Sequence, residues 1–355
     1  MDYRLHSLYR PLQINGMTTG SGYAECHPSA SLLPYVACYW ESGAHEQLMN
    51  DFEQFAEWIH GSPQMQSAPG EVYQRNQQEG LAVSARVLPD GCSDILLTYD
   101  PVRKELDMSC CGNYTKPFVF HEEPATEVST SNRGAGYTFG VRFFPGGARV
   151  FHGMSLDEFT DQRIPLEQCW PRSATELREL GERMLETTSF RERARLMDTY
   201  LNSWISSTLL HGHMAEGDLM KNVLYRIFTS GGQISIQELA ALETVSERQL
   251  HRYFKPWIGI SPKRFSEVVR CQQVLASIQQ GHIQDWAELA VAHGFFDQAH
   301  LIRHFRAWYG ATPGVAAAEH KQKLSVMYNT SRAYSGTLQN IDCKTSCRIR
   351  STEDR

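Results

Sequence analysis

The chain lacks several features that define common classes of protein. Its 355 residues include no Cys-x-x-Cys pair, and its nine cysteines are odd in number and scattered. This distribution argues against a disulfide framework and against a zinc ribbon. The opening residues, MDYRLHSLYRPLQ, lack the apolar stretch of a signal peptide, and no apolar run approaches the roughly 18 residues that suggest a membrane span. We therefore expect a protein of the reducing cytoplasm that binds no metal or cofactor.

The chain also lacks an excess of basic charge. Its formal net charge is −6, and residues 218–320 hold ten lysines and arginines against nine acidic residues. A nucleic-acid-binding domain is usually more basic than this, so only the positions of the charges on individual helices can indicate such a function.

The length of the chain exceeds what one hydrophobic core usually organises, which favours two folded parts.

Residues 1–165 have the pattern of a β-rich domain. Short aromatic or β-branched segments bounded by Gly, Pro and Asp predict strands of a small sheet or barrel at Tyr35–Trp40, Leu81–Val87, Ile95–Tyr99, Phe118–Phe120 and Tyr137–Phe144. Residues 45–80 interrupt this pattern with one amphipathic segment and a Gln-rich stretch, and we interpret them as a surface insertion.

Helical periodicity begins after Pro165 and predicts a connector over residues 166–217. Ser173-x-x-Glu176 and Ser189-x-x-Glu192 have the form of capping boxes, in which serine and glutamate satisfy the free N–H groups of a helix start. At the other end of the chain, residues 321–355 are poor in apolar side chains, and we expect a disordered tail there.

An internal repeat lies between these two segments. The first helix of each copy is offset by 50 residues, as in Glu238-Leu-Ala and Glu288-Leu-Ala, and the offset after the turn becomes 51, which matches Phe254 with Phe305. One residue has therefore been added in the second turn. Two copies are too few for a solenoid, which needs at least about three, so the repeat is a duplicated supersecondary unit.

Each copy has the layout of a helix-turn-helix. A capped helix, a turn and a second capped helix follow one another, with caps at Ser235, Ser246, Asp285 and Asp297. Ser261-Pro262 and Thr312-Pro313 then predict a further helix after each unit. The first of these helices, from Pro262 to about Gln279, would join the two units.

Residues 218–320 closely resemble the DNA-binding domain of AraC/XylS-type transcription regulators. The matching motifs are Ser-x-Arg-x-Leu-x-Arg-x-Phe-Lys, Gly-x-Ser-Pro, Gly-Phe-x-Asp-Gln-Ala-His-Leu-x-Arg-x-Phe-Arg and Gly-x-Thr-Pro. The front half resembles a poorly characterised β-rich domain that often precedes this pair, through Pro34-Tyr35-Val36 with Tyr39-Trp40, Arg86–Asp94, Phe139–Gly147, and Leu166 with Trp170.

The resemblance implies an α+β chain: a β-rich, barrel-like front domain, a helical connector and an all-α domain with two helix-turn-helix units. It implies that the front domain senses a ligand or dimerises, and that the back domain binds promoter DNA. RNA polymerase, a small-molecule effector and a second copy of the chain are the further partners that it suggests.

The second helix of each unit carries most of the residues that we expect to contact DNA, because such a helix enters the major groove. Arginine there can bind guanine with two hydrogen bonds, and small apolar side chains can contact thymine methyl groups. The candidates are Arg248, Gln249, His251, Arg252, Lys255, Lys263, Gln298, Ala299, His300, Ile302, Arg303 and Arg306. Lys263 lies instead at the start of the linking helix, where it either binds phosphate or caps that helix.

Two residues depart from the family pattern. Thr244 occupies a turn position that is usually glycine, and a β-branched residue is costly there if the position requires a positive φ. Pro256 lies near the end of the second helix of unit one, where it would end or bend that helix.

Other functions remain open at this stage. The segment Leu88–Asp94 is either a Pro-Asp-Gly turn before a strand or an active-site loop around Cys92. A DNA-repair enzyme with a reactive cysteine, for which Cys38 and Cys92 are the candidates, and a helical adaptor that binds only protein are the two rival functions. His211 and His213 lack partners for a metal site and favour a linker.

Overall fold

The computed structural model describes residues 3–9, 23–43, 84–121, 136–171, 173–208, 214–281 and 285–320. The predicted insertion at 45–80, the predicted tail at 321–355 and the pair His211 and His213 lie outside these residues. Within the described ranges, no helix has the length and apolar character needed to cross a membrane.

The front half is built on an antiparallel sheet of six strands in the order β1-β2-β7-β4-β5-β8, and on a separate ribbon of β3 and β6. The order leaves β1 and β8 as the two edges. The predicted β-rich architecture is confirmed, and the sequence missed β1, β5 and β8. The strands are β1 (Tyr23–Cys26), β2 (Val36–Gly43), β3 (Ser84–Val87), β4 (Ser93–Asp100), β5 (Glu105–Cys111), β6 (Phe118–His121), β7 (Tyr137–Phe143) and β8 (Arg163–Pro165).

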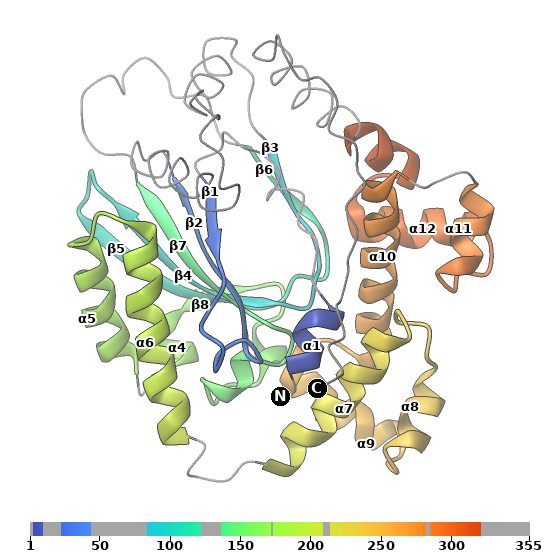
Figure 1. Ribbon diagram of the computed structural model, residues 1–355, viewed down its shortest axis with the longest axis horizontal. Coiled ribbons are helices and arrows are strands. Elements are labelled where there is room, and N and C mark those ends of the chain that lie inside the picture. Colours follow the sequence, from blue (N-terminus) through green and yellow to red (C-terminus); the bar gives the residue numbers. More distant parts are fainter. Residues whose placement is uncertain are drawn as a thin grey trace, which may run out of the picture.

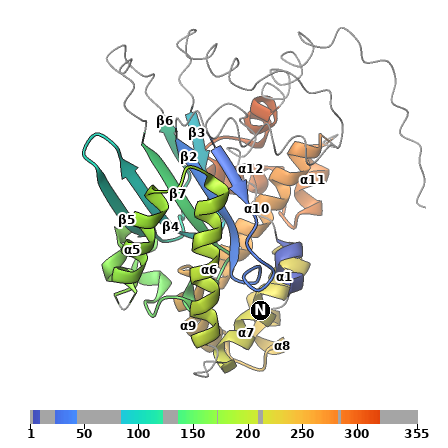
Figure 2. The ribbon, with the colours of Figure 1, turned by 60° about the vertical axis from the view of Figure 1, so that its left-hand side comes forward.

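Helices of the connector cover one face of this sheet (Figures 1 and 2). They are α4 (Leu166–Cys169), α5 (Ala174–Leu185) and α6 (Phe190–Thr208). Their apolar side chains share one buried cluster with the strands, including Leu97, Phe139, Leu177 and Leu201. This burial is the main favourable contribution to the packing.

The two capping boxes predicted for the connector have different outcomes. Ser173 makes no side-chain hydrogen bond to the start of α5, so the predicted capping box is wrong there; its side chain is buried at 1% exposure instead. The hydroxyl of Ser189 does accept the N–H of Glu192 at 3.1 Å.

The C-terminal half is helical, as predicted, and contains α7 (Met214–Thr229), α8 (Ile236–Leu242), α9 (Glu247–Ile258), α10 (Pro262–Gln280), α11 (Trp286–Ala292), α12 (Gln298–Tyr309) and a further helical segment at 313–320. The long helix α10 runs between α8 and α9 at one end and α11 and α12 at the other (Figure 1). The short helix α1 (Tyr3–Leu8) lies beside α7, far from it in sequence.

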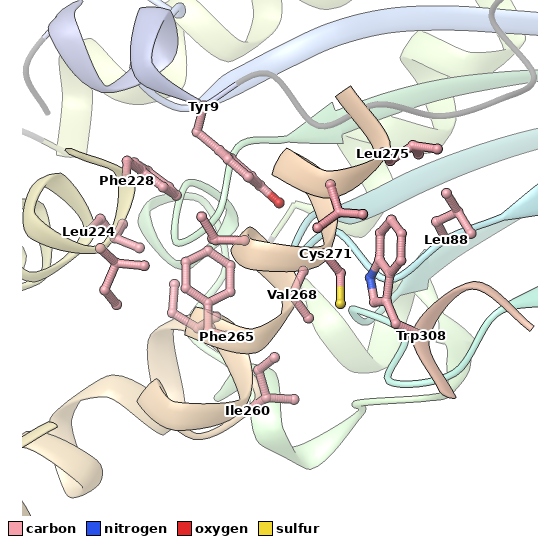
Figure 3. Packing of buried hydrophobic residues seen from close by; sticks show 14 of the residues in the cluster. Tyr9, Leu88, Leu224, Phe228, Ile260, Phe265, Val268, Cys271, Leu275 and Trp308 are labelled. Carbon is pink, nitrogen blue, oxygen red and sulfur yellow. The ribbon is translucent and has the colours of Figure 1, made fainter. Parts of the chain in front are cut away.

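The two halves share one apolar core. Leu5, Tyr9, Leu88 and Phe144 of the front half belong to the same buried cluster as the side chains of α7, α10 and α12. Figure 3 shows Tyr9, Leu88 and Trp308 gathered around the side chains of α10. The position of the C-terminal helices is therefore fixed by contacts with the front half as well as by contacts among themselves.

Candidate nucleic-acid interface

The duplicated units have matching geometry. Helices α8 and α11 each span seven residues, and α9 and α12 each span twelve. The serine and aspartate residues predicted as caps accept the expected backbone N–H groups at all four helix starts. We call α9 and α12 the reading helices.

The turn inside each unit has a left-handed residue at the same place. Thr244 has φ 55° and Gly294 has φ 72°. In both units the next residue donates its N–H back to the carbonyl of the buried alanine, Val245 to Ala240 at 3.0 Å and Phe295 to Ala290 at 2.9 Å. This turn position therefore does have a positive φ in both units, and in unit one threonine adopts that strained conformation.

Apolar side chains fix each reading helix on the rest of its unit. Leu250 and Phe254 of α9, and Leu301 and Phe305 of α12, are fully buried. Pro256 does not end α9, which continues to Ile258 and stops at a left-handed glycine, Gly259. The opposite face of each helix is polar and exposed to solvent.

The structure leaves most of the predicted DNA-contacting side chains exposed. Only His300 and Ile302 are half-buried. The exposed candidates are Arg248, Gln249, His251, Arg252, Lys255, Lys263, Gln298, Ala299, Arg303 and Arg306.

Several of these candidates already have an internal partner. Gln249 accepts the backbone N–H of Ser246 at 2.9 Å and so completes the cap of α9. The Nδ1 atom of His300 accepts the N–H of Phe296 at 3.0 Å. The guanidinium of Arg252 lies over the Tyr253 ring, 5.0 Å from its centroid, which holds this side chain along the helix surface.

The C-terminal end of α9 is held by the front domain, through a set of contacts that we call the α9 clamp. Asn113 donates a side-chain hydrogen bond to the Ile258 carbonyl at 2.5 Å, and Thr160 donates one to the Gly259 carbonyl at 2.9 Å. These donors satisfy carbonyls that a helix end leaves free. Lys255 forms an ion pair with Asp157 at 3.3 Å.

The electrostatics of this ion pair favour its charged form. Burial alone would raise the pKa of Asp157, but hydrogen bonds from Ser155 and Lys255 outweigh burial and lower that pKa. Asp157 therefore stays ionised near neutral pH and places a negative charge beside a lysine predicted to contact DNA.

The loop Leu88–Asp94 forms a second contact between the halves. The Pro89 carbonyl accepts the indole N–H of Trp308 at 2.8 Å. Within the front half, the Asp90 carbonyl accepts the hydroxyl of Tyr9 at 2.8 Å and so supports the loop. Gly91, with φ 77°, lies so close to Phe265 that a Cβ atom there would be 2.3 Å from the ring. The loop does lead into β4 as predicted, but its packing against α10 and α12 was not foreseen.

The two cysteines considered as nucleophiles are buried. Cys38 is 5% exposed and Cys92 is 3% exposed. Burial, together with the negative charges of Glu25 near Cys38 and Asp90 near Cys92, raises the pKa of both thiols well above the usual range. The thiolate is the reactive form of cysteine, so this environment disfavours nucleophilic chemistry. Among the described residues no group of three or more His, Cys, Asp and Glu side chains could hold a metal ion.

Two family models match parts of the chain. A helix-turn-helix domain matches residues 239–318, and a domain of unknown function, DUF6597, matches residues 71–165. The first covers both units and the second covers most of the sheet.

Curated relatives resemble about a quarter of the chain. "XylDLEGF operon transcriptional activator 1" of Pseudomonas putida is 26% identical over 92 residues, which are 25% of this chain and 28% of that protein. An uncharacterized HTH-type transcriptional regulator of Haemophilus influenzae is 33% identical over 78 residues, 22% of this chain and 26% of its own length. The chain thus spans little more than a quarter of these relatives.

Solved structures give low overall scores. A transcriptional regulator of Chromobacterium violaceum, from the AraC-type DNA-binding domain-containing proteins, has a TM-score of 0.28 at 22% identity and covers 30% of this chain and 95% of its own. ToxT of Vibrio cholerae O395 has a TM-score of 0.33 at 8% identity, with 66% of this chain and 93% of its own covered. At these scores the likeness adds nothing to the fold described above.

Proposed function

We propose that the chain is a sequence-specific DNA-binding transcription regulator. The proposal starts from the C-terminal half, which carries a tandem helix-turn-helix domain of the AraC/XylS type. The observation that carries this proposal is the duplicated unit itself, in which two matching reading helices keep their polar faces toward solvent. Each reading helix enters the major groove, and the two occupy successive segments about 34 Å apart, one turn of B-DNA.

The side chains suggest different roles for the two units. On α9, Arg248 and Arg252 offer guanidinium groups that can bind guanine edges. On α12, Arg303 and Arg306 keep that capacity, while Ala299 and Ile302 stand where α9 has polar side chains. We therefore propose that unit one recognises bases mainly by hydrogen bonds and unit two partly by contact with thymine methyl groups.

The front domain controls the back domain in this proposal. The α9 clamp neutralises Lys255 with Asp157 and holds the end of one reading helix, and the loop Leu88–Asp94 holds α10 and α12. A ligand or a second copy that shifts the front sheet would move both contacts. Such a shift would change the spacing of the reading helices and the charge that they offer to DNA.

The partners follow from this function. Promoter DNA is the primary one; RNA polymerase, a small-molecule effector and a second copy of the chain are proposed as further partners, and the cytoplasm as the compartment. A repair enzyme is less well supported, because the thiols of Cys38 and Cys92 are buried and protonated.

Selection of bound duplexes from a random pool with the full chain tests the proposal directly. We expect one sequence family to be enriched, with two conserved segments one helical turn apart. We also expect binding to weaken steeply between about 50 and 200 mM salt, because phosphate contacts release counterions. A chain that enriches no sequence, or whose binding ignores salt, contradicts the proposal.

A further inference from the structure

One large apolar side chain of unit two is almost fully exposed. Phe296 is 88% exposed, the highest value among the exposed large apolar residues that the structure describes, whereas its neighbour Phe295 is 4% exposed. The backbone at Phe296 is held in place, since its N–H donates to Nδ1 of His300 at 3.0 Å. The side chain of Phe296 therefore extends from a fixed backbone position at the surface.

Phe296 is the residue by which the second turn is longer than the first. Phe295 matches Val245, because both close the turn with the same hydrogen bond to an alanine carbonyl. Asp297 matches Ser246, because both cap the reading helix. Only Phe296 stands between these matched pairs, and unit one forms the same turn without a counterpart. The fold of the unit thus does not require this aromatic ring.

The position of Phe296 lies at the start of a reading helix. It directly precedes Asp297, the N-cap of α12, and the N-terminal residues of such a helix are those that approach base edges in the major groove. Ala299 follows within the first turn of α12 and is also exposed. At the position where α9 carries Arg248, α12 carries the apolar Ala299.

The ring itself decides which part of DNA this site would contact. The charges of the turn are mixed, because the carboxylate of Asp297 accepts the N–H of His300 at 2.7 Å and the guanidinium of Arg270 donates to the Gly294 carbonyl at 3.0 Å. A phosphate is bound by hydrogen-bond donors and positive charges, and a phenyl ring offers neither. An uncharged apolar group of a base suits the ring better, and in the major groove that group is the C5-methyl of thymine.

We propose that Phe296 is a specificity-determining residue of unit two, and that its ring packs on the methyl group of one thymine at the target site. This inference rests on the proposed function, since it needs unit two to lie in the major groove.

Replacement of thymine by deoxyuridine tests the contact, because it removes only the methyl group. With the full chain and its selected duplex, we expect deoxyuridine at one position of the unit-two segment to weaken binding about fourfold, the value of one buried methyl group. Phe296→Ala should weaken binding to the thymine duplex by at least the same factor and should bind the two duplexes equally. Phe296→Leu should keep part of the thymine preference.

Val102→Ala provides the matched control. Val102 is 78% exposed in the front domain, so its truncation removes exposed apolar surface away from the reading helices and should leave binding to both duplexes unchanged. A Phe296→Ala variant that binds like the parent, or that keeps the full thymine preference, overturns this inference while the proposed function stands. A parent chain that enriches no sequence overturns both.

Discussion

Thr244 holds a backbone conformation that glycine adopts at little cost. Its φ of 55° lies in the left-handed region, where a residue other than glycine stores about 1–3 kcal/mol of strain. Glycine would remove that strain but would add freedom to the unfolded chain, which costs about 0.4–1 kcal/mol. From the sequence alone, without the observed φ, Thr244→Gly is predicted to change stability by no more than about 1 kcal/mol in either direction.

We predict that Thr244→Gly raises the free energy of unfolding by up to about 2.5 kcal/mol and leaves DNA binding unchanged. Urea denaturation measures the first effect and duplex titration the second. Gly294→Thr is the reverse change in unit two and should destabilise, because a Cβ there would also lie 2.8 Å from Gln233 Cγ. Loss of DNA binding by a folded Thr244→Gly variant would show that the turn depends on threonine itself.

Arg252 and Lys263 are both exposed, but they should affect binding in different ways. Arg252 is on the reading face of α9, and Lys263 follows Pro262 at the start of α10, where a lysine meets phosphate as a point charge. Arg252→Ala should cost about 1–3 kcal/mol on the selected duplex and relax one base preference. Lys263→Ala should weaken binding to all duplexes alike. It should also reduce by about one unit the salt slope, which is the fall of the logarithm of the binding constant with the logarithm of salt concentration.

Titration of both variants against selected, single-mismatch and random duplexes at several salt concentrations separates these effects. If Arg252→Ala weakens every duplex to the same degree, α9 does not recognise sequence.

Residue roles were predictable where they depend on near neighbours in the sequence. The caps at Ser235, Ser246 and Ser261 follow from local spacing, and the structure has them as expected. The ion pair of Lys255 could not be predicted, since its partner Asp157 lies far away in the sequence and only the packed fold brings them together.

At the scale of elements, the α9 clamp couples a reading helix to the front domain. We predict that Asp157→Asn increases affinity for random DNA about two- to fivefold, because an exposed ion pair of this kind is worth up to about 1 kcal/mol. The salt slope should rise as Lys255 becomes available to phosphate. Asp100→Asn removes the same charge at the end of β4, and an equal gain there would mean that net charge alone explains the effect.

The loop Leu88–Asp94 can be tested with a pair of glycines. Gly91 and Gly281 both have positive φ, but a Cβ at Gly91 would strike Phe265, whereas nothing lies within 4 Å of one at Gly281. We predict that both alanine variants lose about 1–2 kcal/mol from backbone strain, and that Gly91→Ala loses about 1–3 kcal/mol more from overpacking. If urea denaturation shows equal losses of stability for the two variants, the loop can move aside without cost and does not fix the position of α10.

Helices with a regular spacing of apolar residues were predictable from the sequence. Strands that are defined by pairing with distant strands were not. The paired helices of each unit and the linking helix α10 follow from apolar spacing and caps. The edge strands β1 and β8 are short, and their pairing partners, not their own residues, define them.

At the scale of the whole molecule, the shared core affects how independent the back domain is. The sequence has a Gly-containing joint at residues 211–217, before the repeat, and this joint predicts that a fragment of residues 216–323 folds alone and binds DNA. Because Leu5, Tyr9 and Leu88 cover part of its core in the full chain, we expect this fragment to melt cooperatively but at a lower temperature than the full chain. A fragment without cooperative melting, or without DNA binding, would contradict the predicted domain boundary.

The contact between α1 and the C-terminal helices also bears on how the chain is made. Tyr9 is synthesised before Phe228 and Phe265, the two aromatic residues that it packs against. During elongation its side chain therefore lacks its final cover. Helix α1 can take its place only after α10 has been synthesised, so the front half cannot reach its finished packing before most of the helical half exists.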